Sequence, residues 1–160
     1  MSTRLKINPR IAYFLGLFEY NYSYNLNEPI IGIMSRKKEI VEEFISIAIN
    51  ELEIEPNKII VEHAKEFDKI YFYNSKLKKL IKRVLERKMH IFKYKNEYSA
   101  NYLKGIYDAA GGIDKKGVYL LNLKNDDMLV MENLGFHTMQ NGSKSYLINK
   151  NTFLEFIRTK

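Results

Sequence analysis

The sequence YLKGIYDAAGG at residues 102–112 has a counterpart near the start of the chain, YFLGLFEYNYS at residues 13–23. Both stretches begin with a tyrosine, an apolar residue and a variable residue, and continue with a glycine, an aliphatic residue, an aromatic residue and an acid. An offset of 89 relates Gly16 to Gly105 and holds for every other matched position (105 − 16 = 89). Because this offset exceeds half of the 160-residue chain, it predicts two copies of one unit related by a pseudo-two-fold axis.

Each glycine of the matched pair, Gly16 and Gly105, lies inside an apolar segment with helical character. A glycine in a helix interior costs about 1 kcal/mol relative to alanine, so it is expected to have a packing reason. Without a Cβ, two such helices can approach backbone to backbone. The acid three residues later lies on the same helical face. We therefore predict a helix-to-helix interface formed by Gly16, Gly105, Glu19 and Asp108, with both helices ending side by side.

The two segments resemble the LAGLIDADG signature of the homing endonuclease family. The second copy fits better, because Gly111 stands at the closing glycine, whereas the first copy has Tyr22 there. In this family the last acid of each motif holds a divalent metal between the two helix ends. The resemblance assigns these catalytic positions to Asn21 and Ala110, and neither residue is a carboxylate.

These replacements bear directly on catalysis. Two-metal phosphodiester cleavage needs anionic oxygen ligands around Mg²⁺. Asn21 offers one neutral oxygen, and Ala110 offers none. Glu19 and Asp108 lie two positions earlier, about 200° round the helix, so they cannot substitute. Asp114 is the nearby spare carboxylate. We therefore expect no metal ligand set and no cofactor, with Mg²⁺ needed only if cleavage is retained.

Composition sets further bounds. The chain carries a formal net charge of +7, which favours a polyanionic partner. It has no cysteine, so disulfides and thiolate metal sites are excluded, and His63, His90 and His137 do not have ligand spacing. No run of about 18 or more apolar residues is present. We expect an intracellular, cytoplasmic or nucleoid-associated monomer with no membrane segment.

Hydrophobic periodicity predicts the order helix, hairpin, helix, hairpin, helix in each half. The expected fold is α+β: two pseudo-symmetric αββαββα halves, each an antiparallel saddle-shaped sheet of four strands with helices on one face, joined through the paired motif helices. The halves are residues 1–89 and 98–160, with a polar and basic connector at 90–97, and together they form one compact unit. We expect helix caps at Ser35, at Ser75 and at the acidic run that begins at Asn125.

The face of each sheet turned away from its helices is expected to be polar. In the first half this face carries Ser23, Asn25, Asn27, Lys69, Tyr71 and Tyr73. In the second half a two-residue turn at Asn141-Gly142 would place Met139 opposite Lys144 and His137 opposite Tyr146, and Lys115 and Lys116 form the other hairpin turn. A β-ribbon fits the major groove of B-DNA, where such side chains can read base edges. The resemblance implies this use, with both sheets over a long pseudo-palindromic duplex.

One helix, which begins at Ser75, has a basic outer face. Its lysines and arginines, with those that follow directly, are Lys76, Lys78, Lys79, Lys82, Arg83, Arg87 and Lys88. This pattern is typical of a solvated helix surface, and phosphate contact is the alternative.

Three functions are compatible with the sequence. The missing acids favour a sequence-specific binder of double-stranded DNA that has lost cleavage. A second possibility is an active, Mg²⁺-dependent homing endonuclease whose metal site has moved to Asp114 or to backbone oxygens. A third is an RNA-binding splicing maturase, a role that some members of the family also have. A degenerate remnant that keeps only the fold is the remaining alternative.

Overall fold

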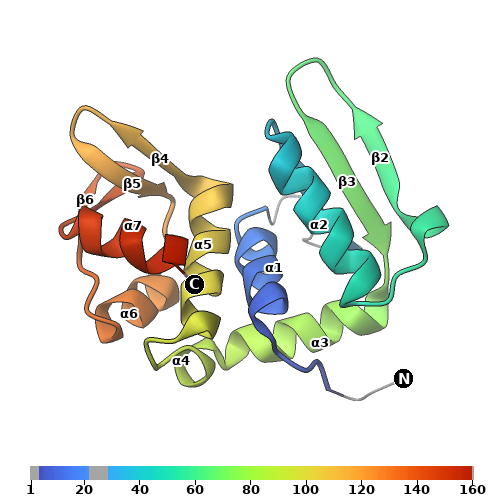
Figure 1. The fold of residues 1–160 in the computed structure, drawn as a ribbon, viewed down its shortest axis with the longest axis horizontal. Coiled ribbons are helices and arrows are strands. Elements are labelled where there is room, and N and C mark those ends of the chain that lie inside the picture. The colour runs from blue at the N-terminus through green and yellow to red at the C-terminus, as the bar shows by residue number, and fades with distance from the viewer. Residues whose placement is uncertain (1–3, 22–28, 160) are drawn as a thin grey trace.

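The computed structural model describes residues 4–21 and 29–159. Figure 1 shows two lobes, each with its own antiparallel sheet, on either side of a central helix pair. The elements are α1 (Pro9–Glu19), β1 (Ile30–Ser35), α2 (Lys38–Asn50), the 3-10 turn η2 (Pro56–Lys58), β2 (Ile60–His63), β3 (Asp68–Tyr73), α3 (Ser75–Glu86), α4 (Lys88–Ile91), α5 (Glu97–Ala110), β4 (Gly111–Asp114), β5 (Gly117–Leu121), α6 (Asn125–Asn133), β6 (Thr138–Asn141), β7 (Lys144–Leu147) and α7 (Lys150–Thr159). The predicted α+β architecture is confirmed.

The central pair consists of α1 and α5, the two motif helices, which lie side by side between the lobes (Figure 1). Asn8 caps α1 by accepting a hydrogen bond from the Ile11 amide over 2.8 Å, and Pro9 occupies the first turn, where its missing N–H costs nothing. Asn96 and Ser99 form a reciprocal capping box at the start of α5. Every residue from Ile11 to Phe18 is buried, so α1 is a core helix of both lobes.

Backbone contact between the motif helices depends on their glycines. A Cβ built on Gly16 would overlap the carbonyl oxygen of Tyr102 and lie 2.8 Å from the amide nitrogen of Ile106. A Cβ on Gly105 would overlap the carbonyl oxygen of Tyr13 and lie 3.0 Å from the Cα of Gly16. Any larger residue at either position must therefore push the two helices apart.

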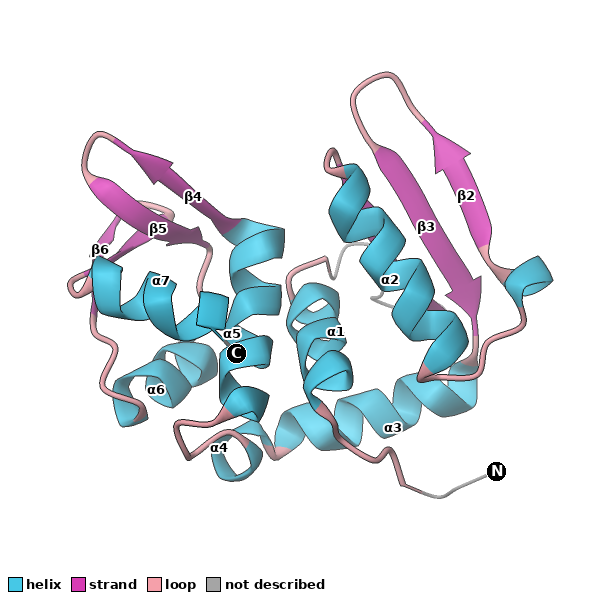
Figure 2. Cartoon of the chain, viewed as in Figure 1, coloured by secondary structure: helices cyan, strands magenta, loops and turns pink. Residues whose placement is uncertain are grey.

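The sheets have antiparallel orders β1-β3-β2 and β4-β5-β7-β6. On the first sheet Ile31, Ile33, Ile70 and Phe72 are almost fully buried, and on the second Val118, Leu120 and Leu147 are buried. Figure 2 shows α2 alongside the first sheet and α7 alongside the second. The strand expected at residues 22–27 lies outside the described residues.

The helix N-caps predicted at Ser35, at Ser75 and at the acidic run that begins at Asn125 are all wrong. Ser35 ends β1, and α2 begins three residues later, with Ser35 Oγ accepting from the Lys37 amide over 3.1 Å. Asn74 caps α3 by accepting from the Leu77 amide over 2.9 Å, while Ser75 is already helical. Lys124 occupies the cap position of α6 without a side-chain bond, so the acidic run does not cap that helix.

The predicted register of the last hairpin is also wrong. Met139 pairs with Tyr146, and Asn141 pairs with Lys144. The turn is Gly142-Ser143, because Gly142 adopts a φ of +65° at its first central position, a conformation that favours glycine. The observed pairing differs from the predicted pairing by two residues, so each side chain stays on the face of the sheet where it was predicted.

Two of the lysines expected on the outer face of α3 are instead buried. Lys78 is 5% exposed and Lys88, which starts α4, is 3% exposed. The other basic residues of that stretch are exposed. Across the described ranges, none of the helices combines the length and apolar character needed to cross a bilayer.

Candidate nucleic-acid interface

The C-terminal ends of the motif helices carry the positions that the resemblance assigns to catalysis. Asn21 uses both ends of its amide within the fold: Nδ2 donates to the Leu17 carbonyl over 2.8 Å, and Oδ1 accepts from the Met34 amide over 3.2 Å. Ala110 is the last residue of α5 and has no side-chain oxygen. These two residues therefore do not fit the divalent metal that the LAGLIDADG arrangement would hold.

Asp114, the carboxylate that could have replaced the motif acids, already has partners. Its Oδ2 accepts from Lys144 Nζ over 2.9 Å and from the Tyr146 hydroxyl over 2.7 Å, and its Oδ1 accepts from the Lys116 amide. The hydrogen bonds from Lys144 and Tyr146 lower the pKa of Asp114 to about 2. Within residues 4–21 and 29–159, no group of three or more histidines or acids is arranged to hold a metal ion.

The solvent-facing side of the second sheet carries an aromatic and charged cluster around this carboxylate. Tyr119 and Tyr146 are cross-strand partners whose rings meet edge to face at 5.9 Å. Lys144 Nζ lies 4.4 Å from the centre of the Tyr119 ring, and its hydrogen bond to Asp114 raises the pKa of the ammonium. Asp114 thus fixes both Lys144 and Tyr146, which together present one positive and one phenolic group on the sheet face.

The other residues predicted on this lobe surround the cluster. Met139 pairs with Tyr146 and is 67% exposed. His137 precedes β6, is exposed, and accepts a backbone bond from the Ile148 amide, so it lies opposite Ile148 rather than Tyr146. Lys115 and Lys116 are exposed in the β4–β5 turn.

The first sheet presents a comparable row on β3. Lys69, Tyr71 and Tyr73 alternate with the buried Ile70 and Phe72, so they share the face away from the core. The rings of Tyr71 and Tyr73 meet edge to face at 5.9 Å, and Tyr73 is 55% exposed. Ser23, Asn25 and Asn27 lie outside the described residues.

The motif acids have structural partners. The Tyr13 hydroxyl donates to Asp108 over 2.6 Å across the helix pair. Glu19 forms ion pairs with Lys124 and, over 3.5 Å, with Lys88. The Tyr13–Asp108 hydrogen bond and the Glu19–Lys124 ion pair thus join the two halves of the chain, whereas the Glu19–Lys88 pair lies within the first half.

Sequence reasoning missed a buried polar cluster centred on Asp127, which is wholly buried. The hydroxyls of Tyr20 and Tyr102 each donate to its carboxylate over 2.6 Å, and Lys88 Nζ lies 3.2 Å from it. Burial by itself lowers the pKa of Lys88, but the carboxylates of Asp127, Glu19 and Asp126 together raise it. The local signal was the acidic pair in the first turn of α6, which is typical of a helix start and does not reveal the partners of Asp127.

These observations define a class of fold: two lobes with antiparallel sheets, joined by glycine-packed motif helices, as in the LAGLIDADG homing endonucleases. No protein-family model and no curated protein matches the sequence. Among solved structures, mesophilic variants of the homing endonuclease I-DmoI superpose with a TM-score of 0.69 at 20% identity, covering 95% of this chain and 96% of that chain. I-DmoI in complex with DNA and Mn gives a TM-score of 0.67 at 20% identity over 94% of this chain and 95% of that one.

A second structural relative has the same domain in a different setting. The N-terminal LAGLIDADG domain of DUF199/WhiA superposes with a TM-score of 0.59 at 12% identity, covering 97% of this chain and 85% of that chain. At these identities the comparisons establish the fold.

Proposed function

We propose that this protein binds a specific sequence of double-stranded DNA through the solvent-facing sides of its two sheets, and that it has lost metal-dependent cleavage. The observation that carries the proposal is the pairing of the LAGLIDADG fold with Asn21 and Ala110 at the ends of its motif helices. The fold supplies the surfaces for a duplex, while the helix ends lack the anionic ligands that two-metal chemistry requires.

Support for a duplex partner comes from charge and from the sheet faces. The chain carries a net charge of +7, and basic residues (Lys69, Lys144, Lys115 and Lys116) occur on or beside both sheet faces. Antiparallel ribbons with polar and aromatic side chains fit the major groove. I-DmoI, which has this fold, has been solved bound to its DNA target.

The proposed arrangement uses the whole chain as one monomeric unit. Residues 1–89 and 98–160 would each contact one half of a long, roughly palindromic site, with residues 90–97 as the connector. The proposed contact set is Ser23, Asn25, Asn27, Lys69, Tyr71 and Tyr73 on the first half and Lys115, Lys116, His137, Met139, Lys144 and Tyr146 on the second. Because α1 and α5 pack backbone to backbone, the spacing between the half-sites would be fixed.

The test is selection of bound sequences from random duplex DNA, with and without Mg²⁺, followed by gel analysis of the products. Enrichment of a long, roughly palindromic duplex that stays uncut supports the proposal. Mg²⁺-dependent cutting of the enriched duplex would show that catalysis survives without the motif acids. Absence of any enriched duplex would rule out specific DNA binding, and intron RNA would then be tested as the alternative ligand. The two ligands can be distinguished, because A-form RNA closes its major groove to a β-ribbon.

A further inference from the structure

A groove opens at the end of the molecule where the motif helices begin. The chain from Arg4 to Ile7 runs beside the C-terminal half of α3 and the end of α4, and encloses an open groove of about 830 Å³ between them. A second groove of about 470 Å³ is lined by the same segment and reaches Leu77. The N-terminal segment therefore covers the apolar side of α3 only in part.

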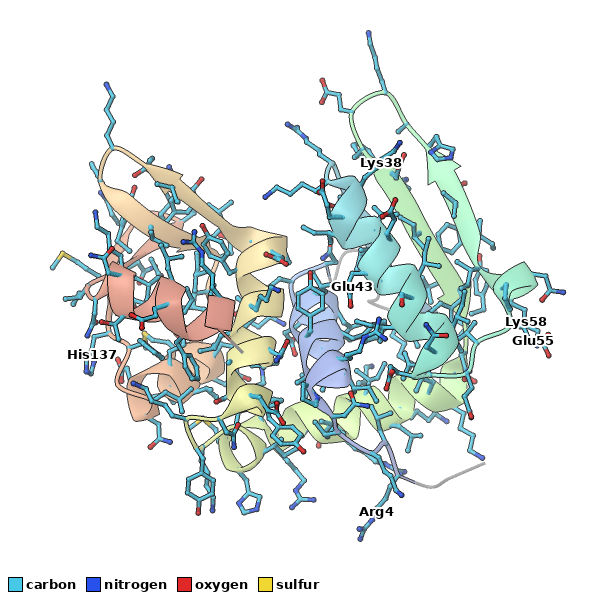
Figure 3. The ribbon with its side chains drawn as sticks, in the orientation of Figure 1. Arg4, Lys38, Glu43, Glu55, Lys58 and His137 are labelled. Atoms are coloured by element: carbon cyan, nitrogen blue, oxygen red, sulfur yellow. The ribbon has the colours of Figure 1, made fainter. Side chains whose placement is uncertain are left out.

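This groove lies at the opposite end of α1 from the motif acid position. Helix α1 has 11 residues, so its start is about 16 Å from the end that carries the motif acid position. Figure 3 shows Arg4 on the side of the molecule opposite the sheet hairpins. A ligand in the groove and a duplex on the sheets would therefore not compete for the same residues.

The lining combines an aliphatic floor with a basic rim. Leu80, Val84 and Ile91 provide the floor, and Arg83 and Arg87 provide the rim. Residues 80, 83, 84 and 87 follow the spacing that places side chains on one helical face. Arg83 and Arg87 are exposed, and within the described part of the chain neither forms an ion pair.

The charge of the lining is strongly biased. Among the described residues of the lining, Arg4, Arg83 and Arg87 carry three positive charges, against one negative charge from Glu86. Arginine forms bidentate bonds with carboxylates and is favoured at protein interfaces. The rim therefore selects for acidic groups, while the floor selects for aliphatic or aromatic side chains between them.

The aliphatic floor distinguishes a peptide from a nucleic acid. Single-stranded nucleic acids are held by basic grooves with aromatic side chains on which bases stack. None of the described residues that line this groove is aromatic. A peptide with alternating acidic and apolar residues satisfies both the rim and the floor, as in other grooves that bind amphipathic segments.

We propose that this groove, formed by residues 4–7 with α3 and α4, is a docking site for an acidic, apolar-rich peptide segment of a partner protein. The site is occupied independently of DNA, so it could connect a DNA-bound protein to a second macromolecule. This inference does not depend on the proposed DNA function, because peptide binding is expected in the absence of any duplex.

The experiment begins with selection of random displayed dodecapeptides on the intact, immobilised chain without DNA. Enriched peptides are expected to carry several Asp or Glu residues interleaved with Leu, Ile or Phe. One enriched peptide, labelled with a fluorophore, is then titrated with two variants. Combining Arg83→Glu with Arg87→Gln changes the net charge by −3 at the rim, and combining Lys38→Glu with Lys150→Gln makes the same change elsewhere.

We expect the rim variant to bind the peptide about tenfold more weakly, and the control variant to bind it within about twofold of the unaltered protein. The rim variant should keep its affinity for a selected duplex within about twofold, because Arg83 and Arg87 are not among the proposed DNA contacts and surface charges are screened over a Debye length of about 8 Å at physiological salt. Thermal unfolding of both variants checks that the substitutions at exposed positions leave the fold intact.

Several results would overturn the proposal. They are enrichment of peptides without acidic residues, equal loss of affinity in the rim and control variants, and displacement of the labelled peptide by single-stranded RNA or by anionic phosphatidylserine vesicles. Displacement by RNA or vesicles would identify the groove as a site for phosphate groups.

Discussion

The hydroxyl of Tyr13 donates a 2.6 Å hydrogen bond to the carboxylate of Asp108, and so joins the middle of α1 to the last turn of α5. The pseudo-symmetric tyrosine is Tyr102, at the common offset of 89 (102 − 13 = 89). Tyr102 donates instead to Asp127, which belongs to α6. The two halves therefore share a backbone plan but differ in their polar contacts, so we expect the two tyrosines to contribute unequally to stability.

The two tyrosines offer a matched test of this asymmetry. Tyr13→Phe removes one donor from the half-buried Asp108, and we expect it to lower the free energy of unfolding by about 1 kcal/mol. Tyr102→Phe removes a donor from the wholly buried Asp127, and we expect a loss of about 2–3 kcal/mol. Urea unfolding measures both, and equal losses would contradict the proposed asymmetry.

The backbone contact at Gly105 predicts a large steric effect. Gly105→Leu places side-chain atoms where the backbone of α1 lies, so we expect a loss of about 3 kcal/mol and a Tm lower by roughly 6–12 °C. Lys104→Leu, at the exposed neighbouring position, is the control and should cost less than about 1 kcal/mol. A Gly105→Leu protein with unchanged stability would disprove the close approach of the helices.

The buried ammonium of Lys88 is surrounded by the carboxylates of Asp127, Asp126 and Glu19. Lys88→Met leaves these carboxylates without their shared cation, and we expect a loss of about 3–5 kcal/mol. Combining it with Asp127→Asn removes one buried negative charge as well, so the double variant should lose less than the sum of the two single losses. Additive losses in urea unfolding would show that Lys88 and Asp127 act independently.

The raised pKa of Lys88 also gives the sign of a pH effect. Its folded-state pKa lies above the unfolded value, so the stabilisation is fully present below the unfolded pKa of about 10.5 and is lost as the pH rises through the folded value. Unfolding measured from neutral to strongly alkaline pH should therefore show a decline that is smaller in the Lys88→Met variant. An identical decline of the free energy of unfolding in both proteins would show that Lys88 does not cause it.

The lowered pKa of Asp114 predicts an effect of acidic pH on the stability of the fold. Its pKa of about 2 lies below the ordinary value of 3.8, so its interactions stabilise the fold above pH 3.8 and are lost as the pH falls toward 2. Carbon-13 NMR titration of the Asp114 carboxyl should give this low pKa in the unaltered protein. Lys144→Met should move it back toward the ordinary value, whereas Lys116→Met, which keeps the backbone bond, should change it little.

Lysines on the sheet faces predict the salt dependence of DNA binding. If Lys144 and Lys69 each neutralise one phosphate, Lys144→Met and Lys69→Met should each reduce the log–log slope of affinity against salt by about one unit. Lys58→Met, in the η2 turn, supplies a control with one charge removed outside the proposed surface. A slope that stays unchanged in the first two variants would place both lysines outside the footprint.

Much of the fold was predictable because it depends on short-range patterns. Alternation along β3 placed Lys69, Tyr71 and Tyr73 on one face, and a strand keeps this alternation whatever its neighbours are. The hairpin at residues 138–147 was predicted with a wrong turn, since both Asn141-Gly142 and Gly142-Ser143 suit a two-residue turn. The predicted face of each side chain was unaffected by this error, because a register shift of two residues leaves every side chain on the same side of the sheet.

The candidate site was less predictable than the fold. The sequence indicated which residues stand at the motif positions, but Asp114 looked like a spare carboxylate because its partners Lys144 and Tyr146 come from another strand, 30 and 32 residues away. Lys88 looked like a surface lysine because nothing in its own segment marks it as buried.

The sequence by itself determined the paired motif helices and the absence of a carboxylate at Asn21 and Ala110, because a glycine at a fixed spacing and the absence of an acid are properties of single positions. Only the tertiary structure decided how the charges are matched. It placed Lys88 among acids from α1 and α6, held Asp114 with Lys144, and left Arg83 and Arg87 beside an open apolar groove. Long-range electrostatic partners depend on which segments the fold brings within a few ångströms, and local periodicity carries no information about that choice.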